Sequence, residues 1–390
     1  MTATLTNATP LEAAQSLAPL IAVHADTAEL GRRLPQPLID AFIDARLFQM
    51  LVPADLGGDD ISFLDNLRVL EELAKSDGSA AWNVMIGSGM GTFAAWLDTE
   101  TALEVFGSQR TVCAGALMAN GVAKRVDGGY LLTGRWPYCS GSQQSSWLHA
   151  GFTIDAGDGV LERSANGRPV VLVAVIPRSE WKIEDTWFTT GMRGTGSHHT
   201  NCTDVFVPQR RVYSLATPAI RRDGPMRRMS QFSVNGPGIA AVCLGIARHA
   251  ISAYVEMAAT KRHALSQELW AERGTSQICV SKAEAALRSA RCFFYDSIGA
   301  VWDAAVNDRD ATLEQRATLR MACVHAAQAS ADVVDMIFRA SGSSATQSTL
   351  PLERCWRDVN TAATHMVVNE SNYESTGRVL FGLPPGIALI

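Results

Sequence analysis

The 390-residue sequence lacks the motifs of several large protein classes. Its eight cysteines include no Cys-x-x-Cys pair, a pattern typical of reduced, buried thiols in a cytosolic protein rather than of a disulfide framework or a zinc site. Neither Gly-x-Gly-x-x-Gly nor Gly-x-x-x-x-Gly-Lys-[Ser/Thr] occurs, so no motif indicates a Rossmann or P-loop nucleotide site. The 34 Lys and Arg against 39 Asp and Glu give a net charge of −5, and no long basic run predicts binding to nucleic acid.

Signals for a membrane or for export are also missing. No apolar stretch reaches the length of a membrane-spanning helix, so we expect no contact with a membrane. The first twenty residues have neither a basic n-region nor a continuous apolar h-region, so we expect no signal peptide. Together these absences predict a cytoplasmic protein.

The pattern of apolar residues divides the chain into three regions. With 47% hydrophobic residues, a chain of this length can bury a large core in two or three domains. Helical spacing dominates residues 1–109, and Ser-Asp-Gly-Ser at 76–79 predicts the end of one helix and the N-cap of the next. Residues 110–213 carry β-strand patterns, and residues 214–390 return to helical spacing. We expect three domains with these boundaries.

The β region and the second helical region have distinct signatures. Residues 122–136 read as a hairpin around an Asp-Gly-Gly turn, and residues 169–177 (PVVLVAVIP) as a strand buried on both faces. The second helical region predicts four long helices, which favours a bundle, and their apolarity on most faces indicates packing on other subunits. These helices are expected at about 239–262, 273–306, 313–341 and 352–381.

Four short stretches, taken in order, carry a resemblance to a known family. They are 51–58 (LVPADLGG), 134–141 (GRWPYCSG), 191–197 (GMRGTGS) followed by 204–208 (DVFVP), and 352–358 (LERCWRD). With these stretches the chain resembles the acyl-CoA dehydrogenase superfamily over nearly its whole length. The resemblance implies an α+β fold with an N-terminal α-helical domain, a middle β-barrel domain and a C-terminal four-helix bundle. It also implies a bound flavin and a homotetramer.

The fold serves both acyl-CoA dehydrogenases and flavin-dependent monooxygenases, and fold alone does not choose between them. Residues 112–121 (VCAGALMANG) lack the Thr-Glu-Pro and Gly-Ser-Asp elements of the dehydrogenases. The dehydrogenases also carry an Arg-x-x-Phe-Gly element that reaches a neighbouring subunit's flavin. At this place the chain has residues 262–266 (RHALS), which keep the arginine, Arg262, but not the Phe-Gly pair. By contrast, residues 134–147 and 356–365 (WRDVNTAATH) resemble the monooxygenase branch. That branch uses O2 and reduced FMN or FAD from a separate reductase.

We therefore expect hydroxylation, or oxidation at nitrogen or sulfur, of a small hydrophobic or aromatic molecule. Met90 stands where many members of the branch carry a histidine, which predicts a different substrate class from their phenols. The alternative is a dehydrogenase, because residues 373–376 (YEST) resemble the motif whose glutamate abstracts the substrate α-proton. Glu374 would then be the base. A third possibility is a degenerate member that acts as a binding protein.

The resemblance assigns catalytic roles to Ser140 and His365. Ser140 is placed to hydrogen-bond flavin N5, with Gly141 allowing a close approach of the backbone; otherwise Ser140 is an ordinary turn residue. His365 is placed as a general acid or hydrogen-bond donor beside the flavin; otherwise it is a histidine at a helix interface.

Other residues are candidates for contacts with the flavin. Trp136 and Tyr138 either wall the flavin ring or pack in the β-domain core. The loop with Arg193, Thr195 and Ser197 is a candidate for the flavin phosphate, although Arg193 can instead pair with a carboxylate such as Asp204. His198 and His199 lack a third ligand at metal spacing, so no metal site is expected. Four apolar residues are either substrate-side or plain helix core: Met85, Met90, Phe93 and Trp96.

Overall fold

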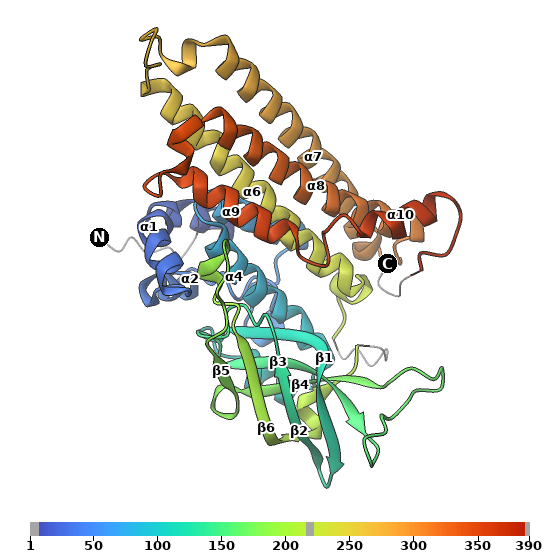
Figure 1. The fold of residues 1–390 in the computed structure, drawn as a ribbon. Coiled ribbons are helices and arrows are strands. Elements are labelled where there is room, and N and C mark those ends of the chain that lie inside the picture. The colour runs from blue at the N-terminus through green and yellow to red at the C-terminus, as the bar shows by residue number, and fades with distance from the viewer. Residues whose placement is uncertain (1–7, 216–221, 387–390) are drawn as a thin grey trace.

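A computed structural model describes residues 8–215 and 222–386 (Figure 1). The chain begins with a helical region, continues through a sheet, and ends in a second set of long helices. The helices of the first region are α1 Pro10–Gly31, α2 Gln36–Asp44, α3 Phe63–Ala74, α4 Gly78–Met90 and α5 Thr99–Phe106.

Capping residues place the helices that matter for the site. Asp77 accepts a hydrogen bond from the backbone N–H of Ala80 at 2.7 Å, which satisfies one of the free donors at the start of α4. The N-cap predicted in the Ser-Asp-Gly-Ser segment is thereby confirmed. Ser62 caps α3 in the same way through the N–H of Asp65. These two helices form one wall of the core next to the long C-terminal helices.

The middle region forms one mixed seven-stranded sheet in the order β5-β6-β2-β1-β3-β4-β7 among the described residues. Residues 127–128 form the turn of the predicted hairpin, because Val126 of β1 pairs with Gly129 of β2. We expected a β-barrel, but the edge strands β5 and β7 do not pair with each other within the described part of the chain. The strands are β1 Cys113–Val126, β2 Gly129–Trp136, β3 Trp147–Asp155, β4 Val171–Pro177, β5 Lys182–Glu184, β6 His199–Pro208 and β7 Val212–Tyr213.

The C-terminal region contains the long helices α6 Gln231–Thr260, α7 Gly274–Val306 and α8 Leu313–Ala340, followed by α9 Pro351–Ala363 and α10 Asn372–Leu380. The expectation of one last helix over 352–381 is wrong. The chain leaves helical geometry after Ala363 and His365 lies in the connection. In Figure 1 the long helices lie side by side above the sheet, and α10 lies at one end of the bundle.

One helix departs from the expectation about membranes. Residues Ser233–Thr260 of α6 are long and apolar enough to span a membrane, although no such stretch was expected. However, 72% of the most apolar part of this helix is buried inside the protein, and a core helix passes the same test. The helix contacts α3, α7, α8 and α9, which explains why it is apolar on most faces.

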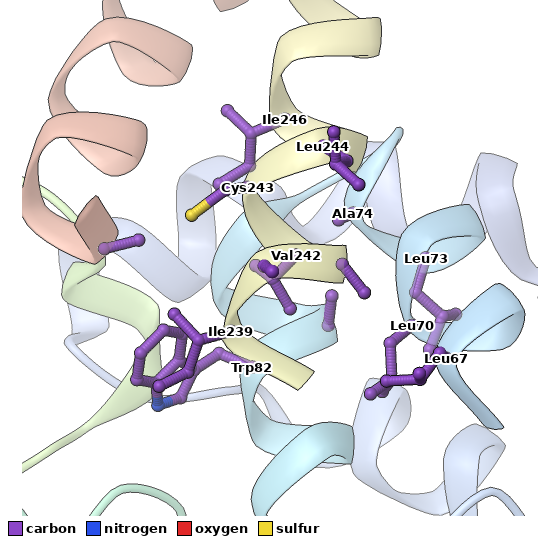
Figure 2. Close-up of a cluster of buried hydrophobic side chains, with 14 of the residues drawn as sticks. Leu67, Leu70, Leu73, Ala74, Trp82, Ile239, Val242, Cys243, Leu244 and Ile246 are labelled. Atoms are coloured by element: carbon purple, nitrogen blue, oxygen red, sulfur yellow. The ribbon is translucent and has the colours of Figure 1, made fainter. Parts of the chain in front are cut away.

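The main core joins the first helical region to α6. Figure 2 shows Leu67, Leu70 and Leu73 of α3 on one side of α6, with Trp82 of α4 beside Ile239 on the other. Such close packing leaves little room for side-chain movement. Trp82 is therefore held in a defined position where the helices meet the sheet.

Candidate active site

A buried turn after β2 is held against a second loop that precedes β6. The backbone N–H of Cys139 donates to the carbonyl of His198 at 3.0 Å, and that of Gly141 donates to the carbonyl of Thr195 at 3.1 Å. Gly141 has φ +73°, and a Cβ there would lie 3.1 Å from Asn83 Oδ1, so a larger residue would be strained. The turn therefore presents Ser140 at a fixed position.

The hydroxyl groups of Ser140, Ser197 and Thr195 form a continuous chain of hydrogen bonds. Ser140 Oγ lies 2.6 Å from Ser197 Oγ, which lies 2.6 Å from Thr195 Oγ1. Thr195 Oγ1 donates to the carbonyl of Met192 at 2.8 Å. At the other end, Trp82 Nε1 donates to Ser140 Oγ at 3.1 Å. All four residues are buried, with exposed fractions of only 2–8%.

Met192 connects this chain of hydroxyls to the bundle. Its backbone is left-handed, with φ 52°, which is unfavourable for a residue with a side chain. Asp358 of α9 accepts a hydrogen bond from the Met192 N–H at 2.5 Å, and Trp187 Nε1 donates to the Met192 carbonyl at 3.0 Å. Gly191 allows this contact, because a Cβ there would lie 2.1 Å from the backbone oxygen of Arg357. The loop thus docks directly on α9.

An ionic network surrounds this docking point. Arg354 contacts Glu29 at 2.7 Å, and Arg357 contacts Glu29 at 2.5 Å, so α1 and α9 are tied together. Burial opposes ionisation of Glu29, but hydrogen bonds from both arginines outweigh it and hold its pKa below the usual range. Burial raises the pKa of Asp77 and of Asp358. Repulsion from Glu29 adds to the effect on Asp77, and repulsion from Asp77 adds to the effect on Asp358.

His365 lies beside Trp82, with the two ring centroids 5.8 Å apart and the rings edge to face. Burial lowers the pKa of His365, so the ring is neutral at pH 7. Its Nδ1 accepts a weak hydrogen bond from the Val367 N–H at 3.3 Å. That contact places the proton of the neutral ring on Nε2, which makes Nε2 a donor.

The other predicted residues do not all join this cluster. Trp136 is fully buried in the sheet core, where its Nε1 donates to the carbonyl of Gly151 at 2.7 Å and its ring covers Gly121 and Gly134. Core packing therefore accounts for Trp136, and we no longer place it against the flavin. Tyr138 differs: 69% of it is exposed, and its ring meets that of Trp187 at right angles.

No hydrogen bond or ion pair among the described residues joins Ser140 to the three charged candidates. Arg193 donates long hydrogen bonds to the carbonyls of Glu29 and Thr189, and Asp204 instead bonds Thr133. Arg262 is exposed after the end of α6, where it bonds the carbonyl of Gln267. Glu374 is exposed in the first turn of α10, and no bond or ring contact in the described residues joins it to Ser140 or Trp82.

Sequence reasoning gave no role at Ser140 to the residues that hold it in place, although Met192 and Asp358 stand in two of the stretches that carry the resemblance. Trp82, Met192 and Asp358 are distant in sequence from Ser140, and only the fold brings them together. A second group was missed near Met90, where His149 Nδ1 lies 3.0 Å from the Tyr213 hydroxyl among aromatic rings. Burial lowers the pKa of His149 to about 3, so this imidazole is also neutral.

Comparison with known proteins identifies the family. Residues 12–104 and 237–370 match the models "Acyl-CoA dehydrogenase, N-terminal domain" and "Acyl-CoA dehydrogenase, C-terminal domain". The chain is 32% identical over 366 residues to indole-3-acetate monooxygenase of Pseudomonas putida, with 92% of each chain covered. It is 30% identical over 396 residues to the flavin-dependent monooxygenase oxygenase subunit HsaA of Mycobacterium tuberculosis, with 97% of each covered. The chain belongs to the flavin-dependent monooxygenase branch of the acyl-CoA dehydrogenase superfamily.

Solved structures agree with this assignment to the flavin-dependent monooxygenases. XiaF from Streptomyces sp., in complex with FADH2 and glycerol, superposes with a TM-score of 0.89 at 27% identity, covering 98% of this chain and 97% of the other. The HsaA monooxygenase of M. tuberculosis superposes with a TM-score of 0.88 at 28% identity, covering 98% and 99%. The predicted family and the predicted order of helical, β and helical regions are confirmed, with a mixed sheet in place of the expected barrel.

The residues present fit a flavin ring. Ser140 Oγ uses its hydrogen and one lone pair inside the protein, which leaves one lone pair for a donor. Ser142 Oγ, two residues away, is buried and has no hydrogen-bond partner among the described residues, as expected of a group that meets a ligand. The exposed ring of Tyr138 offers an aromatic face nearby.

Proposed function

We propose that this chain is the oxygenase component of a two-component flavin-dependent monooxygenase. The observation that carries the proposal is the buried Ser140 hydroxyl, held by Trp82 and Ser197 with one lone pair left over. When bound, reduced flavin reacts with O2 and supplies the oxygen atom for the substrate. One atom of O2 enters the substrate, the other leaves as water, and the flavin provides two electrons.

The residues of this chain have separable roles in that reaction. Ser140 accepts a hydrogen bond from flavin N5–H and fixes the position of the ring. His365 beside Trp82 would stay neutral and offer Nε2–H as a hydrogen-bond donor, which would orient an oxygen atom held there without giving up its proton. The burial of Ser140 and Trp82 keeps water from this edge of the site, which protects the activated oxygen.

We propose a small aromatic substrate. Relatives named for indole-3-acetate and resorcinol support an aromatic ring, and the first of them supports a ring without a phenol hydroxyl. Met90 is the last residue of α4, and its sulfur packs against Gly115 of β1. A Cβ at Gly115 would lie 2.4 Å from that sulfur. Because Met90 is apolar, it offers no hydrogen-bond partner for a phenol hydroxyl, which favours a substrate whose aromatic ring lacks that group. His149 and Tyr213 lie in the aromatic group near Met90. We propose that His149 meets a polar substituent of the substrate, because its buried Nε2 has no hydrogen-bond partner among the described residues.

The partners follow from the same proposal. A separate reductase supplies the reduced flavin, because the sequence carries no nicotinamide-binding motif. We propose that the protein is cytoplasmic and a homotetramer in which the exposed Arg262 reaches the flavin of a neighbour. Apolar side chains exposed on the bundle, such as Ile278 and Phe381, support assembly through this region. The complex of XiaF with FADH2 favours FAD over FMN.

The test is oxygen transfer from labelled O2. The purified protein is mixed with anaerobically reduced FAD or FMN and then with 18O2 and a panel that contains indole-3-acetate and resorcinol. We expect a product 18 mass units heavier per inserted 18O, formed only with the protein and much less with Ser140→Ala. Peroxide release without labelled product from any aromatic substrate would contradict the proposal. Oxidation of an acyl-CoA that depends on Glu374 would favour the dehydrogenase.

A further inference from the structure

The chain of hydroxyls beside Trp82 has a direction, which is set by the groups at its two ends that can only donate or only accept. The Met192 carbonyl oxygen can only accept, so Thr195 must donate to it. Thr195 has a single hydrogen, so its 2.6 Å contact with Ser197 requires Ser197 to donate. By the same argument Ser140 must donate to Ser197.

The other end of the chain agrees with this direction. The indole N–H of Trp82 can only donate, and it points to Ser140 Oγ. The direction is therefore Trp82 to Ser140 to Ser197 to Thr195 to the Met192 carbonyl. The Ser140 hydroxyl therefore has no hydrogen left to donate, and one lone pair remains free to accept a hydrogen bond.

We propose that Thr195 and Ser197 are positioning residues that make Ser140 a hydrogen-bond acceptor, and so make the site selective for reduced over oxidised flavin. The inference rests on the proposed function, in which Ser140 meets flavin N5. Reduced flavin carries a hydrogen on N5 and can donate to the free lone pair of Ser140. In oxidised flavin N5 is an acceptor, so two lone pairs would face each other in a buried site.

The fold supports the direction of this chain from outside. Asp358 accepts from the Met192 N–H and so holds the peptide next to the carbonyl that ends the chain. The same carbonyl also accepts from Trp187 Nε1 at 3.0 Å and from the Thr195 N–H at 3.2 Å. It therefore keeps partners if the Thr195 hydroxyl is removed, and that hydroxyl can be tested with little damage to the loop.

The test compares dissociation constants for oxidised and reduced flavin in the full-length protein. Thr195→Val keeps the shape of the side chain but removes its hydroxyl, and Thr195→Ser is the matched control that keeps the hydroxyl. In Thr195→Val, Ser197 no longer needs to donate to residue 195, so its bond with Ser140 can reverse. Ser140 can then donate to oxidised N5.

We expect Thr195→Val to lower the ratio of the oxidised to the reduced dissociation constant by about five- to tenfold, the effect of one neutral hydrogen bond. Thr195→Ser should keep the wild-type ratio. Oxidised flavin is titrated by fluorescence quenching, and reduced flavin under anaerobic conditions. The bound midpoint potential is an independent readout, because a tenfold change in the ratio equals about 30 mV for two electrons.

Each outcome has a distinct meaning. If Thr195 had only a structural role, Thr195→Val would weaken the binding of oxidised and reduced flavin equally. The ratio of the two dissociation constants would then stay unchanged, which would overturn the inference. Loss of selectivity in Thr195→Ser as well would also overturn it, because the hydroxyl is retained there. Ser197→Ala is a second variant that frees the hydrogen of Ser140, and it should shift the ratio in the same direction. An unchanged ratio in variants of a protein that still transfers oxygen would refute only this inference, whereas a wild type that binds neither redox form would refute the proposed function too.

Discussion

Asp358 offers the sharpest test of how the bundle supports the site. It accepts the Met192 N–H at 2.5 Å and is 4% exposed, so Asp358→Ala leaves a buried donor without a partner. Such a loss costs about 1–3 kcal/mol of unfolding free energy. Asp358→Asn keeps an acceptor oxygen for the Met192 N–H but removes the charge. The two variants therefore separate the hydrogen bond from the ionisation.

The pH dependence of stability distinguishes the two effects. Burial, together with repulsion from Asp77, raises the pKa of Asp358 in the folded protein. The folded state then binds the proton more tightly than the unfolded state, so the stabilisation is full below the ordinary pKa of an aspartate. It is lost as the pH rises through the higher folded pKa. Each unit by which the pKa is raised corresponds to about 1.4 kcal/mol.

The assay is urea unfolding, followed by tryptophan fluorescence, at a series of pH values from 4 to 8. Relative to wild type, Asp358→Asn should gain stability as the pH rises, by more than about 1.4 kcal/mol over the series if the pKa is raised by a unit or more. Asp358→Ala should be destabilised at low pH, with a smaller deficit at pH 8, where the buried charge is costly. A difference between Asp358→Asn and wild type that does not change with pH would refute this account of Asp358.

Three further predictions address single residues. When reduced flavin bound to Ser140→Ala is mixed with O2, stopped-flow absorbance should show oxidised flavin returning sooner than in wild type, while the helical circular dichroism stays unchanged. An unchanged interval would remove Ser140 from the mechanism. Glu374→Gln should leave hydroxylation within about twofold, because the side chain is exposed and no hydrogen bond or ion pair among the described residues joins it to Ser140; a loss of several orders of magnitude would instead support the dehydrogenase. Gly191→Ala should lower the unfolding free energy by about 1–3 kcal/mol, since its Cβ would lie 2.1 Å from the Arg357 carbonyl oxygen; calorimetric stability equal to wild type would show that the loop does not dock there.

Local patterns predicted much of the fold. The helices over 273–306 and 313–341 agree with α7 and α8 within a residue, because long periodic segments carry a strong signal. The last helix was overextended, since the break after Ala363 has no glycine or proline to mark it. The helix expected at about 239–262, apolar on most faces, agrees with α6 except that α6 begins earlier, at Gln231, because Pro237 and the glycines beside it read as a helix start.

The candidate site was only partly predictable. Ser140, Thr195, Ser197 and His365 were found through motifs, and the structure brings the three hydroxyls into one chain. Motifs named these residues without saying what each hydroxyl does. The hydrogens of Thr195 and Ser197 are both used inside the protein, so neither is offered to a flavin phosphate as the motif had suggested. Direction in a hydrogen-bond chain depends on partners that are distant in sequence.

That direction also bears on the choice between the two chemistries of this fold. A dehydrogenase begins its cycle with oxidised flavin, whose N5 accepts a hydrogen bond, so a Ser140 hydroxyl that meets N5, as we propose, would have to donate. Ser140 donates to Ser197 instead, and its oxygen already receives the Trp82 N–H. Only a partner that brings its own hydrogen can complete the bonding of Ser140. The polarity set by Thr195 thus supports an enzyme that receives its flavin already reduced, independently of the exposed position of Glu374.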